Sequence, residues 1–201
     1  MSLLKQYYKF KELEAGVDEA GRGCLAGPVF AAAVVFPSGI TIEGLNDSKK
    51  LSAKKRTILS EMIKKEALAF SVYSIENDII DEINILNASI LAMKMAIQRL
   101  TIQPKFILID GNRFDKEFNL PFETIVKGDS KFQSIAAASI LAKTSRDEYM
   151  SILHNKYPMY NWEKNKGYPS LEHKKLIQKH GLTKYHRRTF NSSLTQKQSI
   201  M

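Results

Sequence analysis

Two adjacent carboxylates stand beside a glycine-rich turn near the start of the chain, in the segment Asp18-Glu19-Ala20-Gly21-Arg22-Gly23. Successive side chains on a strand point to opposite faces, so Asp18 and Glu19 can serve one site only if the chain leaves the strand at this point. The two glycines permit such a turn and let the main chain approach a ligand closely, while Arg22 adds a positive charge. The segment predicts either a carboxylate site beside a ligand-binding turn or an acidic turn on a solvated surface.

Two further carboxylates have a similar context. Asp110 follows the apolar run 106–109 and precedes a glycine, and Asp129 follows the strand-like run 122–126 and a glycine. Strand ends in a parallel or mixed sheet converge on one edge where ligands bind, so the four acids can meet there. Four anions at close range repel one another and demand a compensating cation. Oxygen ligands without a suitable histidine pair favour Mg²⁺ or Mn²⁺ over zinc, and two such ions can catalyse phosphodiester hydrolysis.

The elements that would position these acids follow from the apolar pattern. We expect a strand ending near Glu19 and further strands at 27–36, 67–75, 106–109 and 122–126. We expect three helices: one capped by Ser52 with Ile58, Leu59, Met62 and Ile63 as its apolar face, a long amphipathic one over 78–100, and an alanine-rich one capped by Ser130. The order predicts an α/β fold, with one mixed sheet flanked by helices in residues 1–150.

The composition limits the class of protein. A chain of 201 residues with 44% hydrophobic content can form one large domain with a core. The chain shows neither a signal peptide nor a run approaching about 18 apolar residues, so we expect a cytoplasmic protein without a membrane partner. The single cysteine, Cys24, excludes an internal disulfide and a cysteine-based zinc site, and we expect it to be a small buried filler.

The positive charge is concentrated at the C-terminus. Residues 151–201 carry ten Lys/Arg against two acids, which is +8 of the formal +9, together with all four histidines. We expect these residues to form a basic helical appendage packed on the core. Its aromatic residues offer flat surfaces for bases or sugars: Tyr157, Tyr160, Trp162, Tyr168, Tyr185 and Phe190. The mixture favours a nucleic-acid partner, and a merely solubilising tail is the alternative.

Several segments together resemble the bacterial type 2 ribonucleases H, the ribonuclease HII family. The resemblance covers most of the chain and rests on these segments: 16–23 (GVDEAGRG), 27–29 (GPV), 47–52 (DSKKLS), 109–111 (IDG), 127–129 (KGD), 135–143 with Arg146-Asp147, 166–169 (KGYP) and 186–188 (HRR). The related type 3 enzymes typically have Gly-Lys-Gly where this chain has Gly21-Arg22-Gly23.

The resemblance implies a ribonuclease H-like fold and a metal-dependent endonuclease. Coordination of Mg²⁺ or Mn²⁺ would fall to Asp18, Glu19, Asp110 and Asp129, with Asp18 shared between two ions. The substrates would be RNA–DNA hybrids and DNA duplexes containing single ribonucleotides, cut to leave a 5′-phosphate. The resemblance also makes Tyr168 and the main chain of Gly21, Arg22 and Gly23 readers of the RNA–DNA junction, where a 2′-hydroxyl marks the ribonucleotide. Tyr168-Pro169 departs from the Tyr-Gly of much of the family, which leaves the placement of Tyr168 open.

Four other basic residues are candidate substrate contacts: Lys49, Lys143, Arg146 and Arg187. Lys49 is either a phosphate contact or a solvated loop lysine. Arg146 either pairs with Asp147 at a helix end or lines the substrate groove with Lys143. Arg187, in the HRR segment, is expected to contact phosphate.

Two rival functions have distinct signatures. A dinucleotide-binding loop at Gly21 to Gly27 should open a helix, whereas here Pro28 introduces a strand-like run. A non-catalytic nucleic-acid-binding module would explain the basic tail, but acids at strand ends would weaken its binding to a polyanion unless they held cations. We expect a monomer. The sequence leaves open the preferred ion, the preferred substrate form, a clamp partner, and whether residues 191–201 are ordered.

Overall fold

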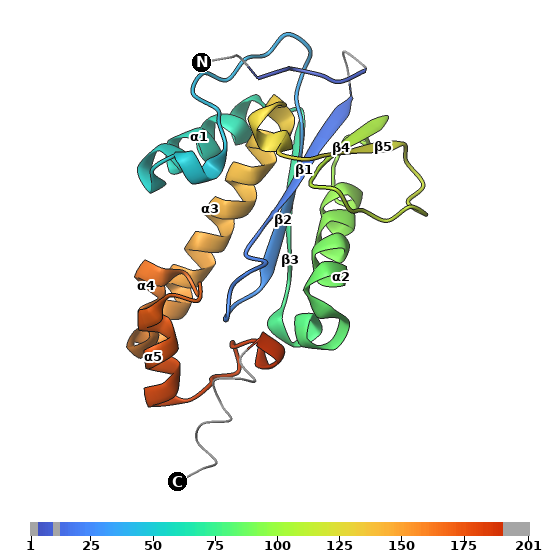
Figure 1. Ribbon diagram of the computed structural model, residues 1–201. Coiled ribbons are helices and arrows are strands. Elements are labelled where there is room, and N and C mark those ends of the chain that lie inside the picture. The colour runs from blue at the N-terminus through green and yellow to red at the C-terminus, as the bar shows by residue number, and fades with distance from the viewer. Residues whose placement is uncertain (1–3, 10–12, 191–201) are drawn as a thin grey trace.

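The computed structural model describes residues 4–9 and 13–190, and the tail 191–201 lies outside the described residues. A five-stranded sheet forms its centre (Figure 1). The strands are β1 (Glu14–Ala20), β2 (Val29–Val35), β3 (Ala69–Ile75), β4 (Phe106–Asp110) and β5 (Phe122–Ile125). The helices are η1 (Ser48–Lys50), α1 (Ala53–Glu66), α2 (Asn77–Gln98), η2 (Gly128–Ser130), α3 (Gln133–Lys156), η3 (Pro158–Tyr160), α4 (Trp162–Asn165) and α5 (Leu171–His180).

The sheet is mixed, as the sequence predicted, with strand order β3-β2-β1-β4-β5. β2 pairs antiparallel with both β1 and β3; the connection from β1 to β2 is short, whereas the connection from β2 to β3 contains η1 and α1. β4 pairs with β1 and β5 pairs with β4, both in parallel. Because β1 lies at the centre, its end meets the end of a parallel neighbour. The topology therefore gathers the ends of β1 and β4 at one edge of the sheet.

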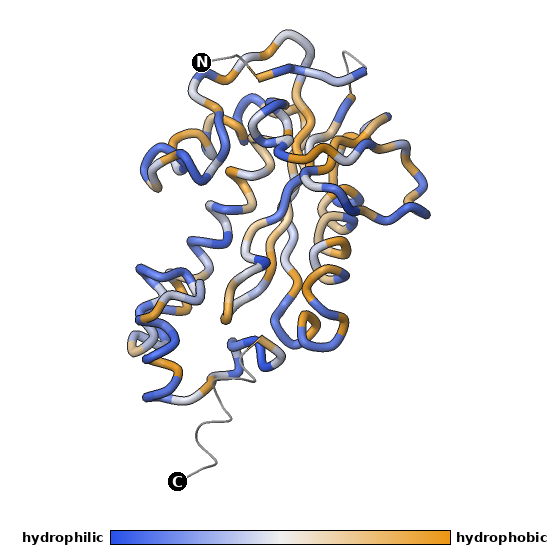
Figure 2. Tube along the Cα trace, viewed as in Figure 1, coloured by the Kyte–Doolittle hydropathy of each residue, from blue (hydrophilic) through white to orange (hydrophobic). Residues whose placement is uncertain are grey.

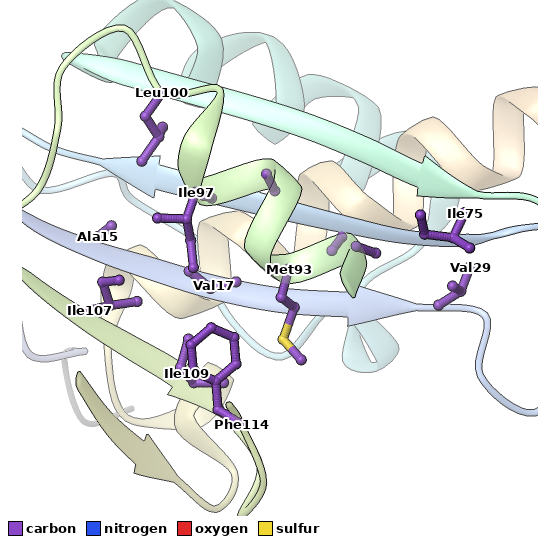
Figure 3. Packing of buried hydrophobic residues seen from close by; sticks show 14 of the residues in the cluster. Ala15, Val17, Val29, Ile75, Met93, Ile97, Leu100, Ile107, Ile109 and Phe114 are labelled. Carbon is purple, nitrogen blue, oxygen red and sulfur yellow. The ribbon is translucent and has the colours of Figure 1, made fainter. Parts of the chain in front are cut away.

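The two faces of the sheet carry separate cores. Ala15 and Val17 of β1 face α2, in the cluster shown in Figure 3. The alternate residues of β2, Ala32 and Val34, face α1 and α3. α3 lies directly on the main chain of β1, because a Cβ added at Gly16 would come within 2.2 Å of the Ser134 carbonyl carbon. This contact fixes α3 against the strand that carries the first two carboxylates.

Three expectations about the helices need correction. Ser52 caps α1 as predicted, but Ile58 and Met62 are exposed, since only Leu59 and Ile63 face α3. The long helix α2 is interrupted at Asn84, whose side chain accepts hydrogen bonds from the next turn. Ser130 does not cap α3; it lies in η2, and its hydroxyl donates to the Lys127 carbonyl.

The C-terminal part of the described chain continues the fold. α3 runs through the expected boundary at residue 150, and Met150 packs in one cluster with Leu25, Ala26, Trp162 and Ile177. α4 and α5 lie at the C-terminal end of α3, and their mostly hydrophilic residues contrast with the more hydrophobic strands at the centre (Figures 1 and 2). Cys24 is buried, as expected. No helix among the described residues is both long and apolar enough to cross a membrane.

Candidate active site

Four carboxylates gather where β1, β4 and β5 end. The parallel register aligns Val17 with Ile109, so Asp18 and Asp110 are the next residues on neighbouring strands. Asp129 follows β5 in η2, and the preceding amide of Gly128 donates to Asp110 Oδ1 at 2.7 Å. The structure thus brings the predicted acids to one edge of the sheet from three separate segments.

The first two acids reach this edge in a way the sequence did not predict. β1 does not end at Glu19 but continues through Ala20, paired with β2. Asp18 therefore points to the α3 face, where it accepts a hydrogen bond from Ser139. Glu19 points to the other face and lines a cleft of about 270 Å³ with Asp110 and residues 111–113. The acids surround the end of the strand from both sides.

Negative charge at this edge is poorly compensated. Burial raises the pKa of Asp18 well above its usual range, and the charges of Glu19 and Asp110 raise it further. Burial also raises the pKa of Glu19, against the lowering effect of Arg22. The pKa of Asp129 is raised by burial and by Asp110. A cation at this edge would relieve the repulsion.

The donor atoms fit a hard divalent ion in their chemistry. All four side chains offer carboxylate oxygen, the preferred ligand of Mg²⁺ and Mn²⁺. Some oxygens are engaged by other groups: Asp18 Oδ1 accepts from the Glu19 amide at 2.7 Å, and Glu19 Oε1 pairs with Arg22 at 3.2 Å. In the described part of the chain, no group of three or more Asp, Glu, His or Cys side chains is arranged so that it could hold a metal ion.

The sequence analysis missed two groups beside the acids. Ser139 bridges Asp18 to Ser48, with a hydroxyl–hydroxyl distance of 3.0 Å. Asp47 caps η1 by accepting from the Lys49 amide and contributes to the raised pKa of Asp129. Segment 47–52 is part of the family resemblance, but the sequence analysis predicted a role only for its Lys49. Lys49 does lie near the acids, since its charge opposes the rise in the pKa of Asp129.

The turn after β1 presents its amides away from the protein interior. Gly21 has φ +96°, a conformation that favours glycine, and the carbonyls of Gly21 and Arg22 accept from Arg187. The two groups of a trans peptide point in opposite directions, so the amides of Arg22 and Gly23 face away from Arg187. The chain then enters β2 and not a helix, which excludes a dinucleotide-binding loop.

The two predicted arginine contacts are wrong as direct contacts. Arg146 and Arg187 are fully buried, and their guanidinium groups donate to main-chain carbonyls. The alternative pairing of Arg146 with Asp147 is also wrong, because Asp147 pairs with Lys143 and Arg56. Both arginines lie beneath the surface that a substrate would touch.

Tyr168 is anchored from three sides. Its ring is 38% exposed and lies 5.5 Å from Lys143 Nζ and 5.6 Å from the Arg146 guanidinium carbon. Its hydroxyl donates to the sulfur of Cys24. The pKa of Tyr168 is raised to about 12, mainly by burial. Its carbonyl accepts from His173 Nδ1 at 2.9 Å, a direction fixed because Trp162 donates to His173 Nε2. Tyr168 is therefore placed beside the turn.

Two of the other C-terminal aromatics, Tyr160 and Trp162, do not offer a surface to bases. Tyr160 and Trp162 are buried and stack on each other at 5.0 Å, beside His173 and His186. They form the core on which Tyr168 rests.

Comparison with known proteins agrees with this geometry. Residues 15–193 match the family model described as Ribonuclease HII. The ribonuclease HII of Bacteroides thetaiotaomicron is 56% identical, with 94% of each chain covered. The crystal structure of the ribonuclease H2 from Pyrococcus horikoshii OT3 has a TM-score of 0.77 at 26% identity, covering 94% of this chain and 99% of that chain.

Two further solved structures contain a bound molecule, a protein in one and a metal ion in the other. The PCNA:RNase HII complex from Archaeoglobus fulgidus matches with a TM-score of 0.74 at 25% identity, covering 90% of this chain and 96% of that chain. Bst-RNase HIII in complex with Mn²⁺ shares the fold, with a TM-score of 0.66 at 18% identity, covering 85% of this chain and 63% of that chain.

The sheet order and the solved relative define a ribonuclease H-like fold, and the family model and the curated relative define a metal-dependent nuclease. The chain belongs to the ribonuclease HII family. Members of this family are endonucleases that cleave RNA in RNA–DNA hybrids and at ribonucleotides embedded in DNA.

Proposed function

We propose that Asp18, Glu19, Asp110 and Asp129 hold two divalent cations, Mg²⁺ or Mn²⁺, and that the chain cuts beside a ribonucleotide to leave a 5′-phosphate. The observation that carries the proposal is the parallel register that places Asp18 beside Asp110 at the ends of β1 and β4, where the charge of Asp110 raises the pKa of Asp18 and of Glu19. The chemistry that such cations supply when bound is activation of water and stabilisation of the leaving oxygen.

The residues of the chain orient these acids before substrate arrives. Ser139 donates to Asp18, and the Gly128 amide donates to Asp110, so both carboxylates keep a fixed direction. Arg22 is half exposed and pairs with Glu19, which places a positive charge between the acids and an approaching phosphate. The exposed amides of the turn and the ring of Tyr168 then select the position of the cut.

The substrate-binding surface extends from this site. We assign direct contacts to Gly21, Arg22, Gly23 and Tyr168, with phosphate contacts from Lys49 and Lys143. Lys143 stands beside the Tyr168 ring, and Lys49 stands beside Asp129. The basic residues of 151–201 add a longer-range attraction for the polyanion. A cytoplasmic monomer acting on hybrids and ribonucleotide-containing DNA accounts for these features.

The experiment is cleavage of a DNA duplex that carries one ribonucleotide, with titration of Mg²⁺ and Mn²⁺ and sequencing of the cut position. We expect one cut beside the ribonucleotide, only with a divalent ion present, and a 5′-phosphate on the product. The matched control is the all-deoxy duplex, which should stay intact. Binding of the substrate without cleavage at any ion concentration would contradict the proposal and favour a non-catalytic module.

A further inference from the structure

A buried guanidinium holds the turn of residues 21–23 from below. Arg187, which lies beyond α5, is fully buried. Its Nη2 donates to the Gly21 carbonyl and its Nη1 to the Arg22 carbonyl, both at 2.8 Å, while Nε donates to the Gly27 carbonyl at 3.0 Å. One planar group thus fixes two carbonyls of the turn and the Gly27 carbonyl further along the loop.

A second buried guanidinium completes the support. Arg146 of α3 donates to the carbonyls of Pro28, Ala26 and Lys166 at 3.1, 3.0 and 2.8 Å. It also lies directly under Gly21, where an added Cβ would come within 2.1 Å of its Nε. The loop between β1 and β2 therefore rests on two side chains that come from distant parts of the chain.

Arg146 also connects the turn to the ring of Tyr168. Its guanidinium carbon lies 5.6 Å from the ring centroid, and its Nη1 holds the Lys166 carbonyl two residues before the tyrosine. A displacement of Arg146 would move the turn and Tyr168 together. The amides of Arg22 and Gly23 and the tyrosine ring are thus parts of one arrangement.

Burial of two positive charges is costly for the fold, because a guanidinium loses its hydration. Burial lowers the pKa of Arg187 to about 10, which expresses this cost. A loop that needed only stability could be held by neutral donors or apolar packing. Unlike neutral donors or apolar packing, a guanidinium group supplies three hydrogen-bond donors in fixed directions within one plane.

We propose that Arg187 and Arg146 are positioning residues that hold residues 21–23 and Tyr168 in one geometry, and so set the selectivity for a single ribonucleotide embedded in DNA. The inference rests on the proposed role of the turn and Tyr168 in contacting substrate. Neither arginine touches the substrate; each acts through the main chain and the ring above it.

The experiment compares Arg187→Lys and Arg146→Lys with the unaltered protein. Lysine keeps the positive charge but cannot supply three donors in one plane. We measure kcat/KM on a duplex with one ribonucleotide and on a long hybrid of the same length. The ratio of the first to the second should fall by about tenfold to a hundredfold, since small misplacements of positioning groups have effects of this size. The salt dependence of KM should not change, because no phosphate contact is lost.

Two controls separate positioning from charge and from stability. Arg188→Lys is the same substitution one residue further on, at an exposed side chain, and should leave the ratio unchanged. Ile63→Val removes a buried methyl group between α1 and α3, away from the turn. It should lower the melting temperature without changing the ratio.

A third variant distinguishes failure of this inference from failure of the proposed function. A Cβ added at Gly23 meets no atom within 4 Å, so Gly23→Ala should fold normally and alter only the surface offered to substrate. An unchanged ratio for Gly23→Ala would refute the role of the turn itself. A reduced ratio for Gly23→Ala, with equal losses on both substrates for the lysine variants, would overturn only the positioning role. Loss of folding in both lysine variants would also overturn it, since the arginines would then serve stability.

Discussion

The acidic edge and the loop behind it both bury charge, but they treat it in opposite ways. At the acidic edge, the charges of Asp18, Glu19 and Asp110 repel one another, and burial together with this repulsion raises the pKa of Asp18 and of Glu19. In the loop, each buried guanidinium has three carbonyl acceptors. In the proposed function a bound cation completes the acidic edge, whereas the hydrogen bonds that hold the loop are already made within the protein.

The difference separates chemistry from selectivity. The acids come from β1, β4 and η2, and the groups that support the turn come from α3 and from the segment after α5. The two regions meet at the end of β1, where Glu19 pairs with Arg22 of the turn, and along α3, which carries both Ser139 and Arg146. Variants in one region should therefore leave the property of the other region intact.

The largest effect should come from the acidic edge. Asp110→Asn removes a charge without changing volume, and its oxygen can still accept from Gly128. Turnover should fall by at least about a hundredfold, the scale seen when one group stabilising a transition state is removed. The melting temperature without divalent ions should rise, because repulsion with Asp18 and Glu19 is relieved. Folded Asp110→Asn with near-normal turnover at saturating Mg²⁺ would contradict the metal assignment.

Removal of the tyrosine ring tests the other side of the comparison. Tyr168→Ala should lose about 1–3 kcal/mol of stacking-type interaction on a duplex with one ribonucleotide. A long hybrid should lose less, because its many phosphate contacts compensate, and metal affinity should be unaltered. Tyr168→Phe is the matched control and should be mild, since it loses only the hydrogen bond to Cys24. Equal losses on both substrates would mean that Tyr168 supports the site and does not recognise the junction.

The buried histidines of the C-terminal core, His173 and His186, should make the free energy of unfolding depend on pH. His186 is buried beside His173, and burial lowers its pKa from 6.5 to about 3. Between pH 6.5 and pH 3, His186 is protonated in the unfolded state but neutral in the folded state. The free energy of unfolding is therefore unaffected by this group above pH 6.5 and decreases as the pH falls towards 3. The contribution is about 1.4 kcal/mol per pH unit for this group. His186→Gln should flatten the pH dependence of urea unfolding.

The matched control for that measurement is His180→Gln, at an exposed position at the end of α5. His173, whose pKa burial also lowers, retains part of the slope in the His186 variant. An unchanged slope in His186→Gln would show that the aromatic core does not exclude the proton.

The smallest effect should come from the rim of the site. Lys49→Gln removes one proposed phosphate contact, so the slope of log affinity against log salt should fall by about 0.9. Catalysis at saturating substrate should change little. Lys50→Gln is the neighbouring control, because Lys50 lines a different cleft with Leu45 and Lys55. The same slope for Lys49→Gln and the unaltered protein would place Lys49 away from the duplex.

The sequence was most informative where the signal is local. The last residue of each predicted strand lies within two residues of the last residue observed, as for β4, which ends at Asp110. It was least informative about exposure. The apolar face predicted for α1 is half exposed, and Tyr160 and Trp162 are core residues, because a pattern shows which residues share a face but not what covers it.

The sequence by itself determined the order of the elements and the acids at the ends of the strands, since apolar periodicity and flanking glycines act within a few residues. The tertiary structure alone decided the roles of Arg146 and Arg187. Arg187 hydrogen-bonds to Gly21 across 166 positions of the chain, and a basic residue has the same appearance in a sequence whether its charge meets phosphate or carbonyl oxygen. Only folding, which buries the guanidinium against the carbonyls of a distant loop, distinguishes the two.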